Sequence, residues 1–321
     1  MTTKTPVAFA QNIIALVWDF DKTLISEYMQ TPIFKKFDVS AADFWEEVNG
    51  LAKHYQNLGV SVNPDTIYLN HFLTWVQKGK LPQITNKSLR EFGQELSFYP
   101  GLPEFFPKIS ELISKDELFS QFNIKVEHYI VSTGFAETIR GSAIAPYVEN
   151  VWGAEFIESP AEPGYLKNPP TNSESSAISQ IATALDNTSK TRYLFEINKG
   201  TNKHPQIGVH SKIDYSQRRI PFDQMIYIAD GPSDVPAFSI LNQSQGHTYA
   251  IYPAGDRQAL RQVNQLQKDG RINLYGEADY REGSHTWLWL TETTRAIAEN
   301  MVKRKKDAIS SNVSAAPQHF N

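Results

Sequence analysis

The sequence predicts an α/β protein in which a doubly wound parallel sheet is interrupted by an inserted helical segment. Three short, continuous apolar runs, at 13–18, 129–131 and 225–229, each have the character of a strand buried on both faces. Each run ends in polar or glycine-containing residues, and apolar residues between the first two runs recur at helical spacing. Because ligands bind at the carboxyl ends of strands in open parallel sheets, we expect the three strand ends to share one site.

The composition is that of an ordinary globular protein. The chain has 321 residues, of which 40% are hydrophobic and 21% are charged, so it can bury a sizeable core. With 31 Lys and Arg against 35 Asp and Glu, the net charge is −4, which predicts neither a nucleic-acid partner nor a membrane partner. The absence of cysteine excludes disulfides, thiolate metal sites and a cysteine nucleophile. Residues 1–11 do not have a signal-peptide pattern, so we expect a cytoplasmic protein.

The segment after the first strand is expected to be helical. Apolar residues at helical spacing predict one helix over 44–58 and a second over 67–76, with Asn63-Pro64 as the N-cap and first-turn signal of the second. The aromatic side chains of these helices are interpreted mainly as core packing. The Pro and Gly residues of 99–103 then mark the return to the sheet near residue 98, followed by a helix over 104–114.

The rest of the chain carries weaker signals. Runs at 151–157 and 247–252 predict two further strands, and the polar stretch 198–222 predicts an inserted loop. A terminal helix is expected over 286–306; the basic run at its end would complement the helix dipole, with a nucleic-acid patch as the minor alternative. Residues 307–321 are expected to be disordered.

Two carboxylates follow the first strand directly. Asp19 and Asp21 are two residues apart, and their mutual repulsion beyond a buried strand calls for a cation. Mg²⁺ prefers oxygen ligands and binds one or two carboxylates together with phosphate oxygens. An isolated Asp-x-Asp pair also occurs in ordinary turns. The six apolar residues before the pair and Thr23-Leu24 after it favour a functional site.

These residues resemble the first motif of the haloacid dehalogenase superfamily, an apolar strand followed by Asp-x-Asp-x-Thr. Ser132-Thr133-Gly134, after the second strand, resembles the second motif in its phosphoserine-phosphatase-like version. Asp230-Gly231-Pro232-Ser233-Asp234, after the third strand, resembles the fourth motif, although Ala229 stands where a glycine is often found.

The third motif of the superfamily is a single lysine, for which the chain offers two candidates. Lys190 follows the hydroxyl residues Thr188 and Ser189 at the start of a predicted helix. Lys199 lies where that helix is predicted to end, and the helix dipole explains a lysine at that position better. Helix geometry therefore favours Lys190, with Lys199 as the alternative.

The resemblance implies a Rossmann-like core formed by 1–25 and 98–306, with a helical cap at 26–97. It implies a magnesium-dependent phosphatase that acts on a small phosphorylated substrate through an aspartyl-phosphate. Asp19 would be the nucleophile and Asp21 the general acid and then the base. The implied metal ligands are Asp19, Asp21, Asp230 and Asp234, and the implied phosphate-binding residues are Ser132, Thr133, Gly134 and Lys190.

Alternative functions stay open at this stage. Dehalogenation is disfavoured because the dehalogenases lack the second aspartate. A phosphomutase or phosphotransferase of the same fold would keep both aspartates, and a non-catalytic protein could use the pocket to bind a phosphorylated metabolite. Substrate specificity is expected to reside in the cap, where the candidate contacts are Tyr28, Gln30, His71 and Arg90.

Overall fold

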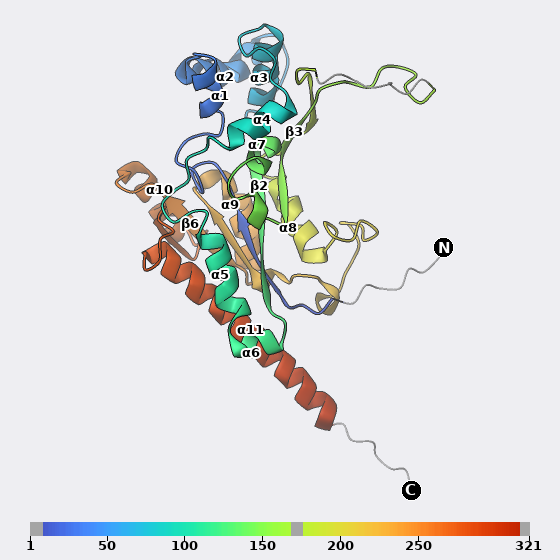
Figure 1. Ribbon diagram of the computed structural model, residues 1–321, viewed down its shortest axis with the longest axis vertical. Helices are drawn as coiled ribbons and strands as arrows, with labels where there is room; N and C mark the ends of the chain where they lie inside the picture. The colour runs from blue at the N-terminus through green and yellow to red at the C-terminus, as the bar shows by residue number, and fades with distance from the viewer. Residues whose placement is uncertain (1–8, 168–175, 315–321) are drawn as a thin grey trace.

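A seven-stranded sheet forms the centre of the computed structural model, which describes residues 9–167 and 176–314 (Figure 1). The strand order is β4-β3-β2-β1-β5-β6-β7, and the edge strand β4 is antiparallel to its neighbour while the other pairs are parallel. The predicted α/β fold with a doubly wound, mostly parallel sheet is confirmed. The strands are β1 Ile13–Trp18, β2 Lys125–Phe135, β3 Asn150–Ile157, β4 Gln180–Thr183, β5 Met225–Ala229, β6 His247–Tyr252 and β7 Leu274–Glu277.

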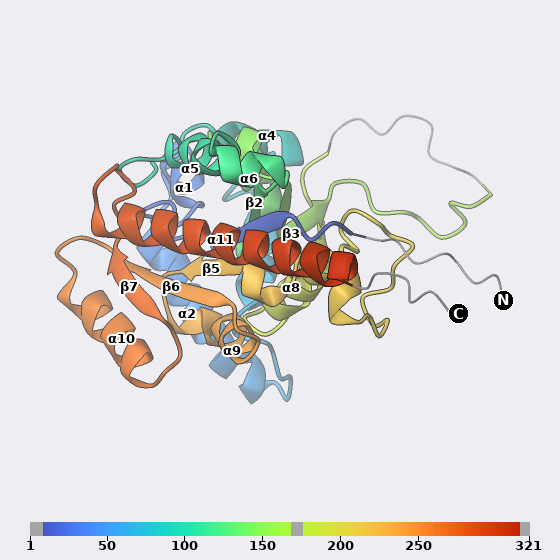
Figure 2. The same ribbon diagram turned by 90° about the horizontal axis from the view of Figure 1, so that it is seen from below.

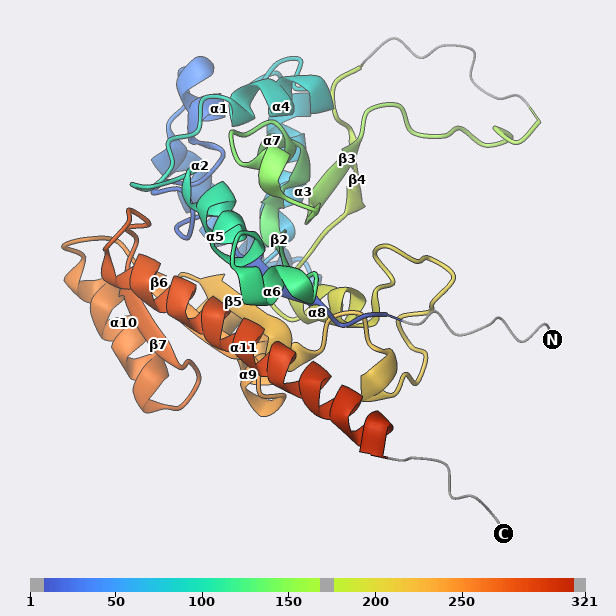
Figure 3. The same ribbon diagram turned by 60° about the horizontal axis from the view of Figure 1, so that its bottom comes forward.

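Helices cover both faces of this sheet, as Figures 2 and 3 show. On β1, Ile14, Leu16 and Trp18 join the core on the side of α5 and α11, whereas Ala15 and Val17 join the core on the side of α8, α9 and α10. All five side chains are fully buried, which explains why the strand is an unbroken apolar run. These helices are α5 Phe105–Ser114, α8 Lys190–Lys199, α9 Val235–Gln243, α10 Arg257–Lys268 and α11 His285–Ser314.

The order of the strands places a switch point beside β1. The chain passes from β1 to β2 on one side and later returns to pair β5 against the other side of β1. Crevices at such reversals, outside the carboxyl ends of the strands, are where open parallel sheets bind ligands. Asp19 and Asp230 are the residues that follow β1 and β5, so the topology brings both to this position.

After β1, residues 26–97 form helices joined by turns and loops, at the top of Figure 1. Phe72 of α3 packs against Phe135 and Phe156, with ring centroids 4.8 Å and 6.4 Å apart, so this segment is attached to the sheet by aromatic contacts. The predicted helices over 44–58 and 67–76 are confirmed. The helices are α1 Thr31–Lys36, α2 Ala41–Asn57, α3 Ile67–Gln77 and α4 Asn86–Gly93; α6 Glu117–Gln121 and α7 Ala136–Arg140 come later.

Two local expectations are corrected by the structure. β2 continues through Phe135, so Ser132, Thr133 and Gly134 lie within the strand instead of in a turn after it. The strand continues past a register shift in its pairing with β3 between Val131 and Phe135. The helix after Asn63 begins only at Ile67, and Asn63 caps a turn before it, where its Oδ1 accepts from the Asp65 amide at 2.9 Å.

The C-terminal helix is longer than predicted. α11 runs from His285 to Ser314, so the expectation of disorder over 307–321 is wrong for 307–314, and 315–321 lie outside the described residues. Residues 307–314 contain neither Gly nor Pro, and each residue added to a formed helix avoids the cost of nucleation. The expected loop at 198–222 is found beyond Lys199, because Gly200 ends α8 in the left-handed region at φ 78°.

No helix in the described ranges combines the length and the apolar character needed to cross a lipid bilayer.

A histidine on β2 is enclosed in the core next to the last residue of β1. His128 is 2% exposed, and its Nδ1 accepts from Trp18 Nε1 at 3.3 Å. Burial lowers the pKa of His128 from 6.5 to about 3, so the ring is neutral in the folded protein. Below pH 6.5 the unfolded chain binds a proton that the folded chain does not, and stability therefore falls as the pH falls.

We expect His128→Asn to flatten this pH dependence, because Asn keeps an acceptor for Trp18 but does not titrate. Between pH 7.5 and pH 5.0, the loss of unfolding free energy should be smaller in the variant by roughly 2 kcal/mol. Urea unfolding at the two pH values measures the difference. His54→Asn, at an exposed position, is the matched control and should keep the wild-type slope; equal slopes in all three proteins would contradict the prediction.

Candidate active site

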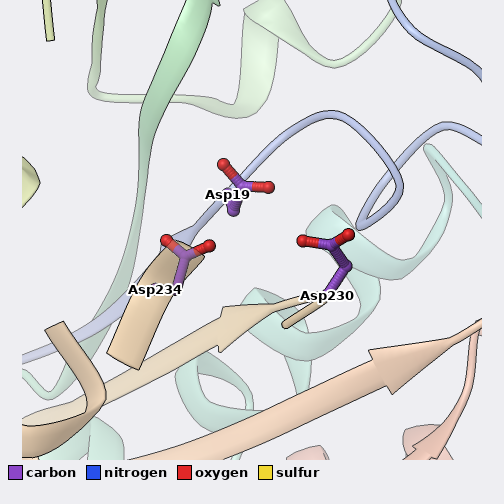
Figure 4. Close-up of side chains that lie close together, drawn as sticks. All are labelled: Asp19, Asp230 and Asp234. Atoms are coloured by element: carbon purple, nitrogen blue, oxygen red, sulfur yellow. The ribbon is translucent and has the colours of Figure 1, made fainter. Parts of the chain in front are cut away.

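Three carboxylates from two distant stretches of chain lie together at the switch point. Asp19, Asp230 and Asp234 each offer an oxygen, and these oxygens lie within 4.8 Å of one another. Figure 4 shows the three side chains gathered beyond the ends of the strands. Asp19 follows β1 and Asp230 follows β5, whereas Asp234 ends the short 3₁₀ turn Pro232–Asp234 that leads into α9.

The backbone fixes Asp19 at the junction of β1 and β5. Its amide donates to the Ile228 carbonyl at 2.9 Å, which continues the pairing of the two strands. Thr23 Oγ1 donates to Asp19 Oδ2 at 3.3 Å. Lys22 has φ 62°, in the left-handed region, so the chain turns sharply between Asp21 and Thr23 and folds back over the strand end.

Lys190 joins two of the carboxylates. Its Nζ lies 2.7 Å from Asp19 Oδ1 and 2.7 Å from Asp234 Oδ1, and its side chain is 2% exposed. Asp234 also accepts from Tyr227 OH at 2.6 Å and from Ser233 Oγ at 2.9 Å, so a rigid set of donors holds it.

The position of Lys190 follows from its place as the first residue of α8. The loop before the helix is closed on itself, because Asp186 Oδ1 accepts from the amides of Thr188 and Ser189 at 3.0 and 2.6 Å. Lys199, at the other end of the helix, donates instead to the carbonyl oxygens of the 198–222 loop. Of the two candidate lysines, the structure brings Lys190 to the carboxylates.

The charges in this cluster are not balanced by the chain itself. Burial raises the pKa of Asp19 to about 6 although Lys190 opposes the shift, and the charge of Asp234 adds to it. Burial, followed by the charges of Asp19 and Asp234, raises the pKa of Asp230 to about 8. Three carboxylates around one ammonium group leave negative charge uncompensated, and all their free ligand atoms are oxygens. This donor set fits a metal ion.

Asp21 is separate from this group. Its Oδ1 accepts from the Met29 amide at 3.0 Å, and its carboxyl is not among the three that lie within 4.8 Å of one another. Burial raises the pKa of Asp21 well above its ordinary value, and the charge of Asp19 adds to the shift. Of the four predicted metal ligands, three therefore come together, and the side chain of Asp21 lines the pocket beside them.

The segment that resembles the second motif lies at the same end of the sheet. Ser132 is buried and its Oγ accepts from the Gly134 amide at 3.0 Å. Thr133 lines the pocket with Asp21, and its carbonyl accepts from Tyr68 OH at 2.6 Å. The hydrogen bond from Tyr68 ties the inserted helices to this strand end.

A pocket of about 290 Å³ lies between the strand ends, through Asp21 and Thr133, and the inserted helices. Asp19, Asp230 and Asp234 are not among its lining residues. Two of the four predicted specificity residues, Tyr28 and Gln30, line it. The other two are engaged elsewhere, since His71 contacts Glu47 at 2.6 Å and Arg90 pairs with Glu137. Sequence reasoning missed several lining residues, because nothing local sets them apart from core or loop positions: Trp45, Asn49, Asp65, Tyr68 and Asn187.

Comparison with known proteins gives one relative in sequence and distant likenesses in structure. No family model matches the chain. An uncharacterized protein of Borreliella burgdorferi is 40% identical over 286 residues, which cover 88% of this chain and 96% of that protein.

Among solved structures, a HAD family hydrolase of Salmonella enterica serovar Typhi has 13% identity and a TM-score of 0.45. The match covers 77% of this chain and 65% of that one, so the chain spans slightly less than two thirds of its length. A phosphoserine phosphatase in apo form has 11% identity and a TM-score of 0.46, with 84% of this chain and 96% of that one covered. At these identities and TM-scores the likenesses carry no information about activity.

We expect Lys190→Met to lower the unfolding free energy by about 3 kcal/mol at pH 7.5 without divalent cations, because Asp19 and Asp234 lose their buried counter-charge. Chemical denaturation measures the loss. It should shrink towards pH 5, because the pKa of Asp19 is raised to about 6 and its protonation removes one of the unpaired charges. Lys199→Met, at the other end of the same helix, is the matched control and should cost much less; equal losses in the two variants would argue against the buried charge pair.

Proposed function

The chain belongs to one protein family with the Borreliella burgdorferi protein, and we propose that it is a magnesium-dependent phosphatase of the haloacid dehalogenase type. The substrate would be a small phosphorylated metabolite. The observation that carries the proposal is Lys190 held 2.7 Å from both Asp19 and Asp234 at the switch point of a parallel sheet. Segments that resemble the first, third and fourth motifs supply Asp19, Lys190 and Asp234, and Thr133 of the second-motif segment lines a pocket with Asp21.

Asp19 is the proposed nucleophile. One of its oxygens is held by Lys190 and the other accepts a hydrogen bond from Thr23, so the carboxylate is fixed in orientation. A bond forms between an Asp19 oxygen and phosphorus while the bond from phosphorus to the leaving oxygen breaks, which gives an aspartyl-phosphate. Water then attacks phosphorus, the bond to Asp19 breaks, and inorganic phosphate leaves.

Asp21 is the proposed proton carrier for both halves of this reaction. Its raised pKa keeps the carboxyl protonated nearer to neutral pH than that of a free aspartate, as a general acid requires. It would donate its proton to the leaving oxygen and afterwards accept a proton from the attacking water. Its hydrogen bond from the Met29 amide fixes it on the pocket side of Asp19.

Mg²⁺ is the proposed metal, held by Asp19, Asp230 and Asp234. Its charge would offset the carboxylates and the phosphoryl oxygens, which would otherwise repel one another. Lys190 contributes a fixed positive charge for the same purpose. Ser132, Thr133 and Gly134 would supply hydroxyl and amide donors to the phosphoryl oxygens.

The helical segment at 26–97 is the proposed cap. It supplies much of the lining of the pocket, including Gln30, Trp45 and Tyr68. Asp21 and Thr133 line the other side, where the phosphoryl group would lie. A segment placed in this way can exclude water from the reaction and contact the leaving group. The pocket volume of about 290 Å³ suits a small metabolite.

We expect the protein to release phosphate from p-nitrophenyl phosphate in the presence of Mg²⁺, and Asp19→Asn to lower kcat by at least roughly a thousandfold because the nucleophile is lost. Excess chelator should stop the reaction and added Mg²⁺ should restore it. Asp43→Asn, at the exposed start of α2, is the matched control and should keep wild-type activity. Phosphate release assays measure all of these.

Other outcomes of this experiment point to other functions. Full activity of Asp19→Asn, or full activity in chelator, would overturn the mechanism. Tight binding of a phosphorylated metabolite without turnover would indicate a binding protein. Return of the phosphoryl group to an organic hydroxyl, instead of release as phosphate, would indicate a mutase or phosphotransferase.

The loss of kcat/KM caused by Asp21→Asn should depend on the leaving group, because a general acid contributes most when the leaving oxygen is poorly stabilised. We expect roughly 10²–10⁴-fold loss of kcat/KM for an alkyl phosphate and a smaller loss for p-nitrophenyl phosphate. The phosphoenzyme should accumulate, since the base for its hydrolysis is also removed, and acid quench with hydroxylamine release detects it. The double variant Asp19→Asn/Asp21→Asn should accumulate no phosphoenzyme. Equal losses of kcat/KM for both esters would refute the role of Asp21.

A further inference from the structure

The charge of the pocket lining limits what the leaving group can be, given the proposed function of the neighbouring carboxylates. Apart from two tyrosines, the ionisable residues that line the pocket are Asp21 and Asp65. None of the described lining residues is Lys, Arg or His. A carboxylate or second phosphate on the leaving group would find no basic partner among these lining residues, whereas a cation would be attracted to Asp65.

A buried acceptor in the same pocket lacks a donor. Gln30 is 2% exposed, lines the pocket, and has no hydrogen-bond partner for its Oε1 within the described part of the chain. A buried carbonyl oxygen without a partner is unfavourable, and few such groups occur in folded proteins. Because Gln30 belongs to the pocket lining, rotation of its side-chain amide would offer this oxygen to an N–H or O–H of a bound molecule.

Aromatic rings form one wall. Trp45 lies between Tyr28 and Tyr68, with ring centroids 5.2 Å and 5.7 Å away. The Tyr28 ring already carries a cation, since Lys22 Nζ lies 5.0 Å from its centroid and donates to the Ser26 carbonyl. Lys22 is not in the pocket lining, whereas Trp45 and Tyr68 are, so a cation that enters with the substrate would meet these two residues.

From the charge of the lining, the unpartnered Gln30 oxygen and the aromatic wall, we infer that the leaving group carries a protonated amine and no carboxylate. The substrate class is the phosphate monoester of a short amino alcohol. The phosphoryl group lies against Asp19, the ammonium group donates to Gln30 and is attracted to Asp65, and Trp45 covers its carbon chain. The small volume of the pocket favours a linker of a few atoms.

The experiment compares two esters of nearly equal size that differ in charge, 2-aminoethyl phosphate and 2-hydroxyethyl phosphate. We expect kcat/KM to be roughly tenfold or more higher for the amine. O-phosphoserine, which adds a carboxylate to the amine, should be hydrolysed less efficiently than 2-aminoethyl phosphate. p-Nitrophenyl phosphate reports the basal reaction in every preparation.

Two variants test the residues. Asp65→Asn keeps the shape but removes the charge, and should lower the amine-to-hydroxyl ratio of kcat/KM roughly three- to tenfold. Gln30→Met removes the acceptor at similar volume and should also lower the ratio. Glu46→Gln, an exposed carboxylate on α2 next to Trp45 but outside the lining, is the matched control and should leave the ratio unchanged.

The outcomes separate this inference from the proposed function. Hydrolysis of p-nitrophenyl phosphate with no preference for the amine would overturn the inference alone. Absence of all hydrolysis would overturn the proposed function, and calorimetric binding of both esters to Asp19→Asn would then decide the inference. Tighter binding of the amine would support it, and equal or weaker binding would overturn it.

Discussion

The constraint on which the rest of the structure depends is the burial of several carboxylates around a single ammonium group. Lys190 pairs with both Asp19 and Asp234. Asp21 and Asp230 lie close enough for the charge of Asp19 to raise their pKa values. Burial raises the pKa of Asp19, Asp21 and Asp230, so a chain selected for stability alone would not be expected to gather these groups. The excess negative charge is instead suited to a cation and a phosphoryl group.

The sheet provides the rigid support that this arrangement requires. Asp19 and Asp230 follow adjacent parallel strands whose side chains are buried on both faces, so neither carboxylate can withdraw without disturbing the core. Asp234 and Lys190 are positioned by the starts of two helices that pack on the same face of the sheet, α9 and α8. The charged groups are therefore fixed by elements whose stability comes from apolar packing elsewhere.

The inserted helices have a different part. The proposed nucleophile lies at a strand end of the sheet. The inserted segment supplies much of the pocket wall, including Gln30, Trp45 and Tyr68, and the leaving group would lie against it. The hydrogen bond from Tyr68 to the Thr133 carbonyl and the contacts of Phe72 join the helices to the strand ends. Under the proposed function, the reaction would belong to the strand ends and the choice of substrate to the inserted helices.

Local sequence was sufficient to predict an element or a site residue wherever one short segment contained the whole pattern. The apolar runs before Asp19 and Asp230 identified β1 and β5, and the same two segments supplied all three carboxylates that meet, Asp234 included. The short elements were missed, including β4, β7 and α1, because their few residues carry too weak a periodicity. The continuation of β2 through Ser132 and of α11 to Ser314 was missed because packing and helix propagation extend elements beyond their local signals.

By itself, the sequence determined the fold class, the carboxylates and the order in which they occur along the chain. Only the tertiary structure decided between Lys190 and Lys199, separated Asp21 from the other three aspartates, and showed that Asp65 and Trp45 share a pocket with Gln30. The physical reason is that strand patterns are local, whereas distances between side chains depend on how β1, β5, α8 and the inserted helices pack together. Residues far apart in the chain become neighbours only through that packing.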